Sequence, residues 1–175
     1  MPASSMTETQ LEIISHSPAE TAAIGAALAG CLRDGDVVLL HGDLGAGKTT
    51  LAKGVASALG IEDVVSSPSF ALVNEYDTGL AAAVTRLYHL DLYRLRTEDD
   101  LASIGFDDFM APTGGITLVE WPERAVTALP ERFLLVEIET VRPGSRRLRF
   151  VPIPDDEVSG RCIESLRSHI GSNAG

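Results

Sequence analysis

The stretch that decides the fold runs from residue 37 to residue 60 and reads VVLLHGDLGAGKTTLAKGVASALG. Its first four residues form an uninterrupted run of valine and leucine, which is typical of a strand buried on both faces of a parallel sheet. Thr49 to Leu59 has the spacing of an apolar helix face, and Gly60 is the expected end of that helix. A buried strand, a glycine-rich loop and a helix in this order predict an α/β fold.

The loop between this strand and helix, Gly42 to Thr49, matches the pattern G-x-x-x-x-G-K-[ST]. Its glycines let the backbone curl so that successive N–H groups point at the β-phosphate of a nucleotide, and the helix N-terminus adds its positive end. Lys48 is expected to reach the β- and γ-phosphates, and the Thr49 hydroxyl to bind magnesium. The predicted nucleotide-binding residues of this segment are Gly45, Ala46, Gly47, Lys48, Thr49 and Thr50. The alternative is a glycine-rich turn without a ligand.

Two acidic residues stand at the ends of predicted strands. Glu120 follows the apolar run Ile116 to Val119, the arrangement of a Walker-B acid at the carboxyl edge of a sheet, where α/β proteins bind ligands. Because magnesium takes oxygen ligands and keeps several waters, Glu120 is expected to bind it together with Thr49. An acid that only caps a strand end in solvent is the alternative. Asp91 is expected to orient the attacking water or a metal-bound water, so Lys48, Asp91 and Glu120 are the predicted catalytic residues.

Three neighbouring features each admit two readings. Residues 67–70, Ser-Pro-Ser-Phe, form either an ordinary proline turn or a switch segment that senses the γ-phosphate and magnesium. His89 is more often a structural histidine than a catalytic base, and Trp121 lies either in the core or beside the nucleotide.

The guanine-reading signature Asn-Lys-x-Asp is absent, because neither Asn74 nor Asn173 is followed by lysine, so adenine is the expected base.

The chain is acidic overall. It has 175 residues, with 25 Asp and Glu against 14 Lys and Arg, and a formal net charge of -11. Phosphate backbones bind best to clustered cations, so we do not expect the chain to bind nucleic acid by itself, and a partner would hold any RNA. The exception is a basic segment near the end, which contains Arg142, Arg146, Arg147 and Arg149. A solvated hairpin face and a phosphate or partner contact are both open for these four residues.

The sequence predicts a cytoplasmic protein without a membrane segment. No apolar stretch approaches the roughly 20 residues that a membrane helix needs. The first ten residues lack the basic cluster and apolar core of a targeting signal. Cys31 and Cys162 form neither a disulfide framework nor a Cys-x-x-Cys metal pair, so both are expected to be buried thiols in a reducing compartment.

We expect one domain with two terminal extensions. Residues 1–10 form a flexible tail, residues 11–153 the phosphate-loop domain, and residues 154–175 a C-terminal helix with a loose tail. Ser17-Pro18-Ala19-Glu20 has the form of a capping box at the start of the first helix. Strand-like segments around the turn at 77–79 and near the end of the domain predict antiparallel hairpins. The sheet should therefore be mixed and flanked by helices.

Four motifs together resemble the TsaE (YjeE) family of small bacterial phosphate-loop ATPases. They are GDLGAGKTTL at 42–51, SPSF at 67–70, HLDLYRL at 89–95 and VEWP at 119–122. They follow the family's order, and the resemblance covers most of the chain. Members help to make threonylcarbamoyladenosine, the modified nucleoside next to the anticodon of some tRNAs. The resemblance implies ATP and Mg²⁺ as cofactors, and TsaB-like and TsaD-like partners through which alone the chain would meet tRNA.

The resemblance also implies roles for single residues. Magnesium binding would fall to Thr49 and Glu120, hydrolysis to Asp91, and switching to residues 67–70. Ser17 and Pro18 at the first helix and Gly144 to Arg146 in the last hairpin would approach the adenine. Ser69 departs from the threonine usual in the family but retains a hydroxyl.

Two other functions remain open. A small-molecule kinase would use the same loop with Arg142, Arg146 and Arg147 as lid arginines, although no substrate-binding insertion is visible. A non-catalytic binding module would use ATP only to order residues 67–70 for a partner. ATP consumption that requires a small acceptor would favour the kinase, and phosphate release well above background would count against the module.

Overall fold

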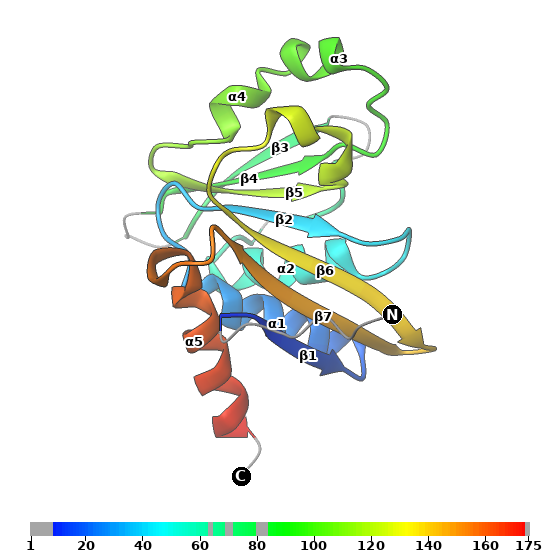
Figure 1. Cartoon of the computed structure of the whole chain (residues 1–175), viewed down its shortest axis with the longest axis vertical. Coiled ribbons are helices and arrows are strands. Elements are labelled where there is room, and N and C mark those ends of the chain that lie inside the picture. The colour runs from blue at the N-terminus through cyan, green and yellow to red at the C-terminus, as the bar shows by residue number, and fades with distance from the viewer. Residues whose placement is uncertain (1–8, 63–64, 69–71, 80–83, 174–175) are drawn as a thin grey trace.

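The computed structural model describes residues 9–62, 65–68, 72–79 and 84–173. Within these residues a mixed seven-stranded sheet forms the centre of the molecule, in the order β1-β7-β6-β2-β5-β4-β3 (Figure 1). Its strands are β1 Leu11–Ser15, β2 Val37–His41, β3 Val73–Asp77, β4 Arg86–Asp91, β5 Gly115–Glu120, β6 Phe133–Arg142 and β7 Ser145–Ile153. Strands β6, β2, β5 and β4 run parallel, while β1, β7 and β3 pair antiparallel to their neighbours. The predicted mixed α/β sheet with antiparallel hairpins is confirmed.

Helices cover both faces of the sheet. The α-helices are α1 Pro18–Ala29, α2 Lys48–Ala58, α3 Glu98–Ser103, α4 Phe106–Phe109 and α5 Glu157–Asn173, and two 3-10 turns, η1 Pro122–Arg124 and η2 Val126–Ala128, follow β5. Helices α1, α2 and α5 pack into one core cluster, and α3 and α4 belong to the cluster on the other face (Figure 1). Strand β2 contributes side chains to both clusters. Val38 and Leu40 point into the cluster with α1, α2 and α5, and Val37 and Leu39 point into the cluster with α3 and α4. This is the doubly buried strand that the valine and leucine run predicts.

Helices α1 and α2 lie in close contact through two glycines. A methyl group built on Gly54 would lie 2.0 Å from the carbonyl oxygen of Ala22, and one built on Gly25 would lie 2.3 Å from that of Leu51. Backbone therefore meets backbone, with no room for a side chain at either glycine. This contact places the first turn of α1 beside the loop that precedes α2. A methyl group on Gly47 in that loop would lie 3.8 Å from Cγ2 of Thr21.

Half of the predicted capping box forms at the start of α1. The Oγ of Ser17 accepts a hydrogen bond from the backbone N–H of Glu20 at 3.1 Å, with Pro18 in the first turn. The Glu20 carboxylate accepts from the N–H of His16 at 2.7 Å, one residue before the cap. These contacts satisfy N–H groups that the helix itself leaves without partners.

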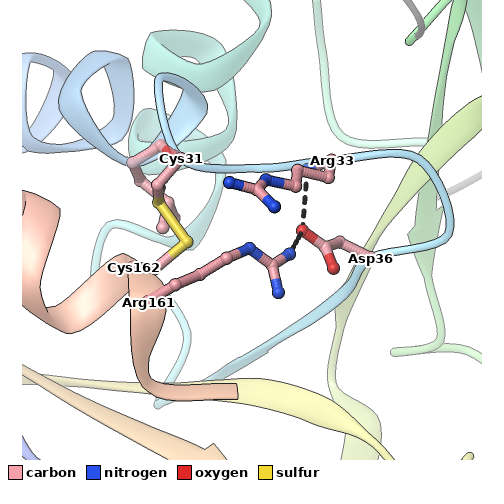
Figure 2. Close-up of a disulfide and its surroundings, with 6 residues drawn as sticks. Cys31, Arg33, Asp36, Arg161 and Cys162 are labelled. Carbon is pink, nitrogen blue, oxygen red and sulfur yellow. Dashed lines mark hydrogen bonds and ion pairs between the residues drawn. A yellow bond between two sulfur atoms is a disulfide. The ribbon is translucent and has the colours of Figure 1, made fainter. Parts of the chain in front are cut away.

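The two cysteines form a disulfide, so the expectation of free thiols is wrong. Cys31, just after α1, is bonded to Cys162 in α5, with 5.2 Å between their Cα atoms (Figure 2). The expected burial is correct, since both side chains are buried. Beside the disulfide, the guanidinium group of Arg161 pairs with the carboxylate of Asp36, which precedes β2 (Figure 2). Helix α5 is therefore fastened to the sheet domain by a covalent bond and an ion pair.

One class of element is missing from the described part of the chain: no helix there is long and apolar enough to cross a membrane.

Candidate functional site

The loop from β2 to α2 has the curled backbone that its glycines predict. Gly47, which precedes α2, has φ 115°, a conformation that side chains rarely adopt. At Gly42 the limit is space, because a methyl group there would lie 2.3 Å from the carbonyl oxygen of Ile138 in β6. The loop thus fits tightly over the carboxyl ends of β2 and β6, at the N-terminus of α2.

Lys48 is buried at the centre of this loop. Its Nζ donates hydrogen bonds to the carbonyl oxygens of Gly42 and Asp43, and it lies 3.9 Å from the centre of a Trp121 ring. Burial lowers the pKa of the Lys48 ammonium group, and the carboxylate of Glu120 opposes that shift. A cation in such poorly solvated surroundings attracts a phosphate more strongly than one in water. Trp121 contacts Lys48 and at the same time packs on the core.

Thr49 and Glu120 meet directly. The Oγ1 of Thr49 lies 2.9 Å from Oε1 and 3.1 Å from Oε2 of Glu120, whose side chain is almost completely buried. The reading of Glu120 as a solvent-exposed cap is therefore wrong. A hydroxyl and a carboxylate converging on one point are oxygen donors that suit magnesium, which completes its coordination with water and phosphate oxygens. Among the described residues there is no cluster of three or more His, Cys, Asp and Glu that could hold a metal without such outside ligands.

Asp91 lies beside Glu120 because β4 and β5 are parallel neighbours with these residues in register. Its Oδ1 accepts from the N–H of Tyr93 at 3.0 Å, and its Oδ2 accepts from the hydroxyl of Ser67. The first residue of the expected switch segment, Ser67, is thus hydrogen-bonded to Asp91. Ser69 and Phe70 lie outside the described residues. On the same strand, Nε2 of His89 lies 2.8 Å from Oε1 of Glu120.

A cavity of about 300 Å³ brings the predicted catalytic residues together. Its lining consists of Leu44, Gly45, Gly47, Lys48, Thr49, Thr50, Ser67, Asp91, Tyr93, Glu120 and Trp121. The loop, the ends of β4 and β5 and the first residue of the expected switch segment all contribute. This is the carboxyl edge of the parallel strands, where open α/β sheets bind ligands.

Ser17 and Gly144, the residues expected near an adenine, lie outside the lining of this cavity. Ser17 caps α1, and Gly144 forms the turn between β6 and β7, where a methyl group would lie 3.8 Å from the carbonyl oxygen of His16. Ser17 and Gly144 therefore lie close to each other, where the turn of the last hairpin meets the start of α1. Their expected contact with a nucleotide stays a prediction.

Two arginines of the basic segment lie on the solvated hairpin face, as one of the two readings expects. Arg147 pairs with Glu139 at 2.9 Å and Arg149 with Glu137 at 3.3 Å, on the exposed face of the sheet. Arg146 turns the other way and donates through Nε to the carbonyl oxygen of Ala46 at 2.7 Å. The three arginines of the kinase reading, Arg142, Arg146 and Arg147, are absent from the cavity lining, and contact of the segment with a phosphate or a partner stays a prediction.

Comparison with known proteins agrees with this geometry. The family model described as "Threonylcarbamoyl adenosine biosynthesis protein TsaE" matches residues 15–148. The chain belongs to the TsaE family. The relative from Bacillus subtilis named "tRNA threonylcarbamoyladenosine biosynthesis protein TsaE" is 39% identical over 82% of this chain and 87% of its own length. The protein of that name from Treponema pallidum is 36% identical over 79% of this chain and 98% of its own.

A solved structure extends the match to the fold. The crystal structure of Bacillus subtilis YdiB superposes with a TM-score of 0.75 at 34% identity, covering 91% of this chain and 95% of that one. The resemblance to the TsaE family that the motifs suggest is confirmed, and a role in tRNA threonylcarbamoyladenosine biosynthesis follows from it. The family match ends before α5, so it includes Cys31 but not Cys162 of the disulfide.

Sequence reasoning about this TsaE-family chain missed three contacts. His89 bonds to Glu120, Arg146 to the loop carbonyl, and the Tyr93 ring packs at a tilt against Trp121 with 4.8 Å between ring centres. One signal was available for His89, which stands two residues before Asp91 and so points to the same face of the strand. The other two contacts join distant segments and leave no local pattern.

Proposed function

We propose that the protein binds ATP with magnesium and hydrolyses it in support of tRNA threonylcarbamoyladenosine synthesis, together with TsaB-like and TsaD-like proteins. The biosynthetic role rests on family membership. The observation that carries the proposed chemistry is the direct contact of Thr49 with Glu120 at the mouth of a glycine-rich phosphate loop, with Asp91 in the same cavity.

In the proposed mechanism the loop and Lys48 hold the phosphates. Lys48 leaves the carbonyl oxygens of Gly42 and Asp43 and pairs with phosphate oxygens, a charge-assisted contact that is stronger than the bonds it replaces. Thr49 and Glu120 would hold magnesium, which supplies charge neutralisation on the phosphate oxygens. Asp91 orients the attacking water, for which its carboxylate must exchange the hydroxyl of Ser67.

Partners enter the proposal because no second cation is found among the described residues that line the cavity. Lys48 is the one Lys or Arg among them, and Arg146 is bonded to the loop backbone. A phosphate-loop protein hydrolyses slowly until a supplied arginine or a fixed switch segment stabilises the transferred phosphoryl group. We therefore propose that partner proteins complete the site, and that tRNA is met only through them, given the net charge of -11.

The proposed compartment is the cytoplasm, where tRNA is modified. The Cys31–Cys162 disulfide is unusual there, because cytosolic reductants keep most thiols reduced. Neither cysteine lines the nucleotide cavity, so the proposed activity does not depend on the bond.

Reconstitution tests the proposal. TsaB-like and TsaD-like proteins of the same organism are incubated with tRNA, threonine, bicarbonate, ATP and the enzyme that makes the threonylcarbamoyl donor, with and without this chain. Threonylcarbamoyladenosine is then measured by nucleoside mass spectrometry over many turnovers. We expect sustained formation only with the chain present and loss of that effect in Lys48→Ala. Equal formation without the chain would contradict the proposal.

A further inference from the structure

His89 is buried on the face of the sheet that holds the two acidic residues of the site. Along β4, Leu87, His89 and Asp91 point toward α2, and Glu120 points the same way from the adjacent parallel strand. The side chains of His89 and Glu120 are 0% and 3% exposed. His89 is absent from the cavity lining, and among the described residues its link to the site is the hydrogen bond to Glu120.

The hydrogen bonds fix which ring nitrogen of His89 carries the proton. The Glu120 carboxylate accepts hydrogen bonds, so Nε2 is the donor over the 2.8 Å contact. Nδ1 is buried and has no hydrogen-bond partner among the described residues. The tautomer with its proton on Nε2 satisfies this arrangement, because an N–H on Nδ1 would be buried without an acceptor among the described residues.

Among the described residues, the side chains of Thr49 and His89 form hydrogen bonds with Glu120, and the two differ in whether magnesium binding would move them. Thr49 donates its hydroxyl to both carboxylate oxygens, but that hydroxyl must turn its oxygen toward the metal when magnesium binds. The bond from His89 to Oε1 involves no group that has to move. His89 is thus the contact that can keep Oε1 in place and leave Oε2 aimed at Thr49.

We propose that His89 is a positioning residue, which holds the carboxylate of Glu120 in the orientation that magnesium binding requires. The inference rests on the proposed function and deepens it. Partners that orient metal ligands typically contribute about 10-fold to 100-fold in metal affinity. The loss of His89 should therefore weaken the magnesium-dependent part of nucleotide binding, while the phosphate contacts of the loop stay intact.

Calorimetry with a non-hydrolysable ATP analogue tests this, with magnesium and with EDTA. The ratio of the two affinities is the magnesium-dependent gain. We expect His89→Leu to reduce that gain about tenfold or more and to leave the affinity in EDTA within about threefold of wild type. His89→Gln, whose amide N–H can reach the position of Nε2, should restore most of the gain.

Tyr88→Leu is the matched control. Tyr88 neighbours His89 on β4 but packs on Phe109 in the opposite cluster, so a general loosening of the strand would appear in this variant as well. The control should keep the full magnesium-dependent gain. An unchanged gain in His89→Leu, or an equal loss in Tyr88→Leu, would overturn the inference.

Nitrogen NMR of the wild-type protein keeps the test independent of whether the variants fold. The spectrum should show the proton of the His89 ring on Nε2, and a proton on Nδ1 alone would overturn the inference. If the wild type gains no affinity from magnesium, the proposed function fails and this inference falls with it. A wild-type gain that survives in His89→Leu removes the inference alone.

Discussion

The acidic residues of the cavity differ in what holds them, and that difference separates their proposed roles. Glu120 is bonded to Thr49 and His89, whereas Asp91 is bonded to Ser67 and to a backbone N–H. The first set fixes a carboxylate beside a metal-binding hydroxyl. The second includes a hydroxyl from the expected switch segment, which can be exchanged for water.

Glu120→Ala and Asp91→Ala should therefore fail in different ways. The first should abolish most of the magnesium-dependent gain in ATP affinity, and the second should leave binding near normal and reduce hydrolysis at least about 100-fold. Asp77→Ala, which removes an exposed carboxylate at the end of β3, is the control and should change neither. Calorimetry measures the binding of ATP and phosphate release measures its hydrolysis, both with the partners present. The reverse pattern would exchange the proposed roles of Glu120 and Asp91.

Arg146 gives a second test at the scale of one residue. Its bond to the Ala46 carbonyl points that oxygen toward the hairpin, so the N–H of Gly47 on the other side of the same trans peptide points away from it. Arg146→Ala should weaken nucleotide binding about tenfold, equally with magnesium and with EDTA. Arg147→Ala, whose guanidinium pairs with Glu139 on the exposed face, should bind as the wild type does. Equal affinities for both variants would refute a role of Arg146 in ordering the loop.

At the scale of elements, the contact between α1 and α2 depends on the absence of a side chain at Gly54. Gly54→Ala would force a methyl group against the Ala22 carbonyl and should destabilise the protein by about 1 to 3 kcal/mol, although alanine is the better helix former. Gly160→Ala in α5 is the control, since its nearest neighbour would lie 3.8 Å away, and it should be neutral or stabilising. Urea unfolding measures both, and a stabilised Gly54→Ala would show that the helices can separate without cost.

Local patterns predicted the elements that carry the site, because each depends on neighbours along the chain. The valine and leucine run marks β2, the glycine pattern marks the loop, and Ser17 marks the start of α1. The contact of His89 with Glu120 depends on the pairing of β4 with β5, and α3 and α4 intervene between those strands. Alternation along β4 indicates a shared face for His89 and Asp91, but no periodicity in one sequence specifies which strand lies beside it.

The disulfide was unpredictable for the same physical reason. Cys31 and Cys162 are separated by 131 positions and meet because α5 docks on α1 through buried Ile163 and Leu166. The spacing of two cysteines carries no signal for such a pairing, and the expected reducing compartment argued against it. Burial, which depends on the apolar face of each helix, was within reach of the sequence.

On the scale of the whole molecule, this disulfide closes a long loop that contains β2 to β7 and α2 to α4. In the chain-entropy model, a loop of 131 residues contributes roughly 5 kcal/mol to stability. The double variant Cys31→Ser/Cys162→Ser should lose up to that amount in urea unfolding, with nucleotide affinity unchanged, because neither residue lines the cavity. Reducing agent should lower the wild-type midpoint and leave the double variant unaffected. A wild-type midpoint indifferent to reduction would contradict the stabilising role.

We propose that this chain is a magnesium-dependent ATPase whose site is completed by partner proteins. Steady-state phosphate release with and without the TsaB-like and TsaD-like pair tests this proposal, with Lys48→Ala as the background. We expect a very low rate for the chain alone and a rise of at least about tenfold with the pair, the modest end of what completing such a site contributes. Full activity of the chain alone, or no release above the Lys48→Ala background with the pair present, would contradict it.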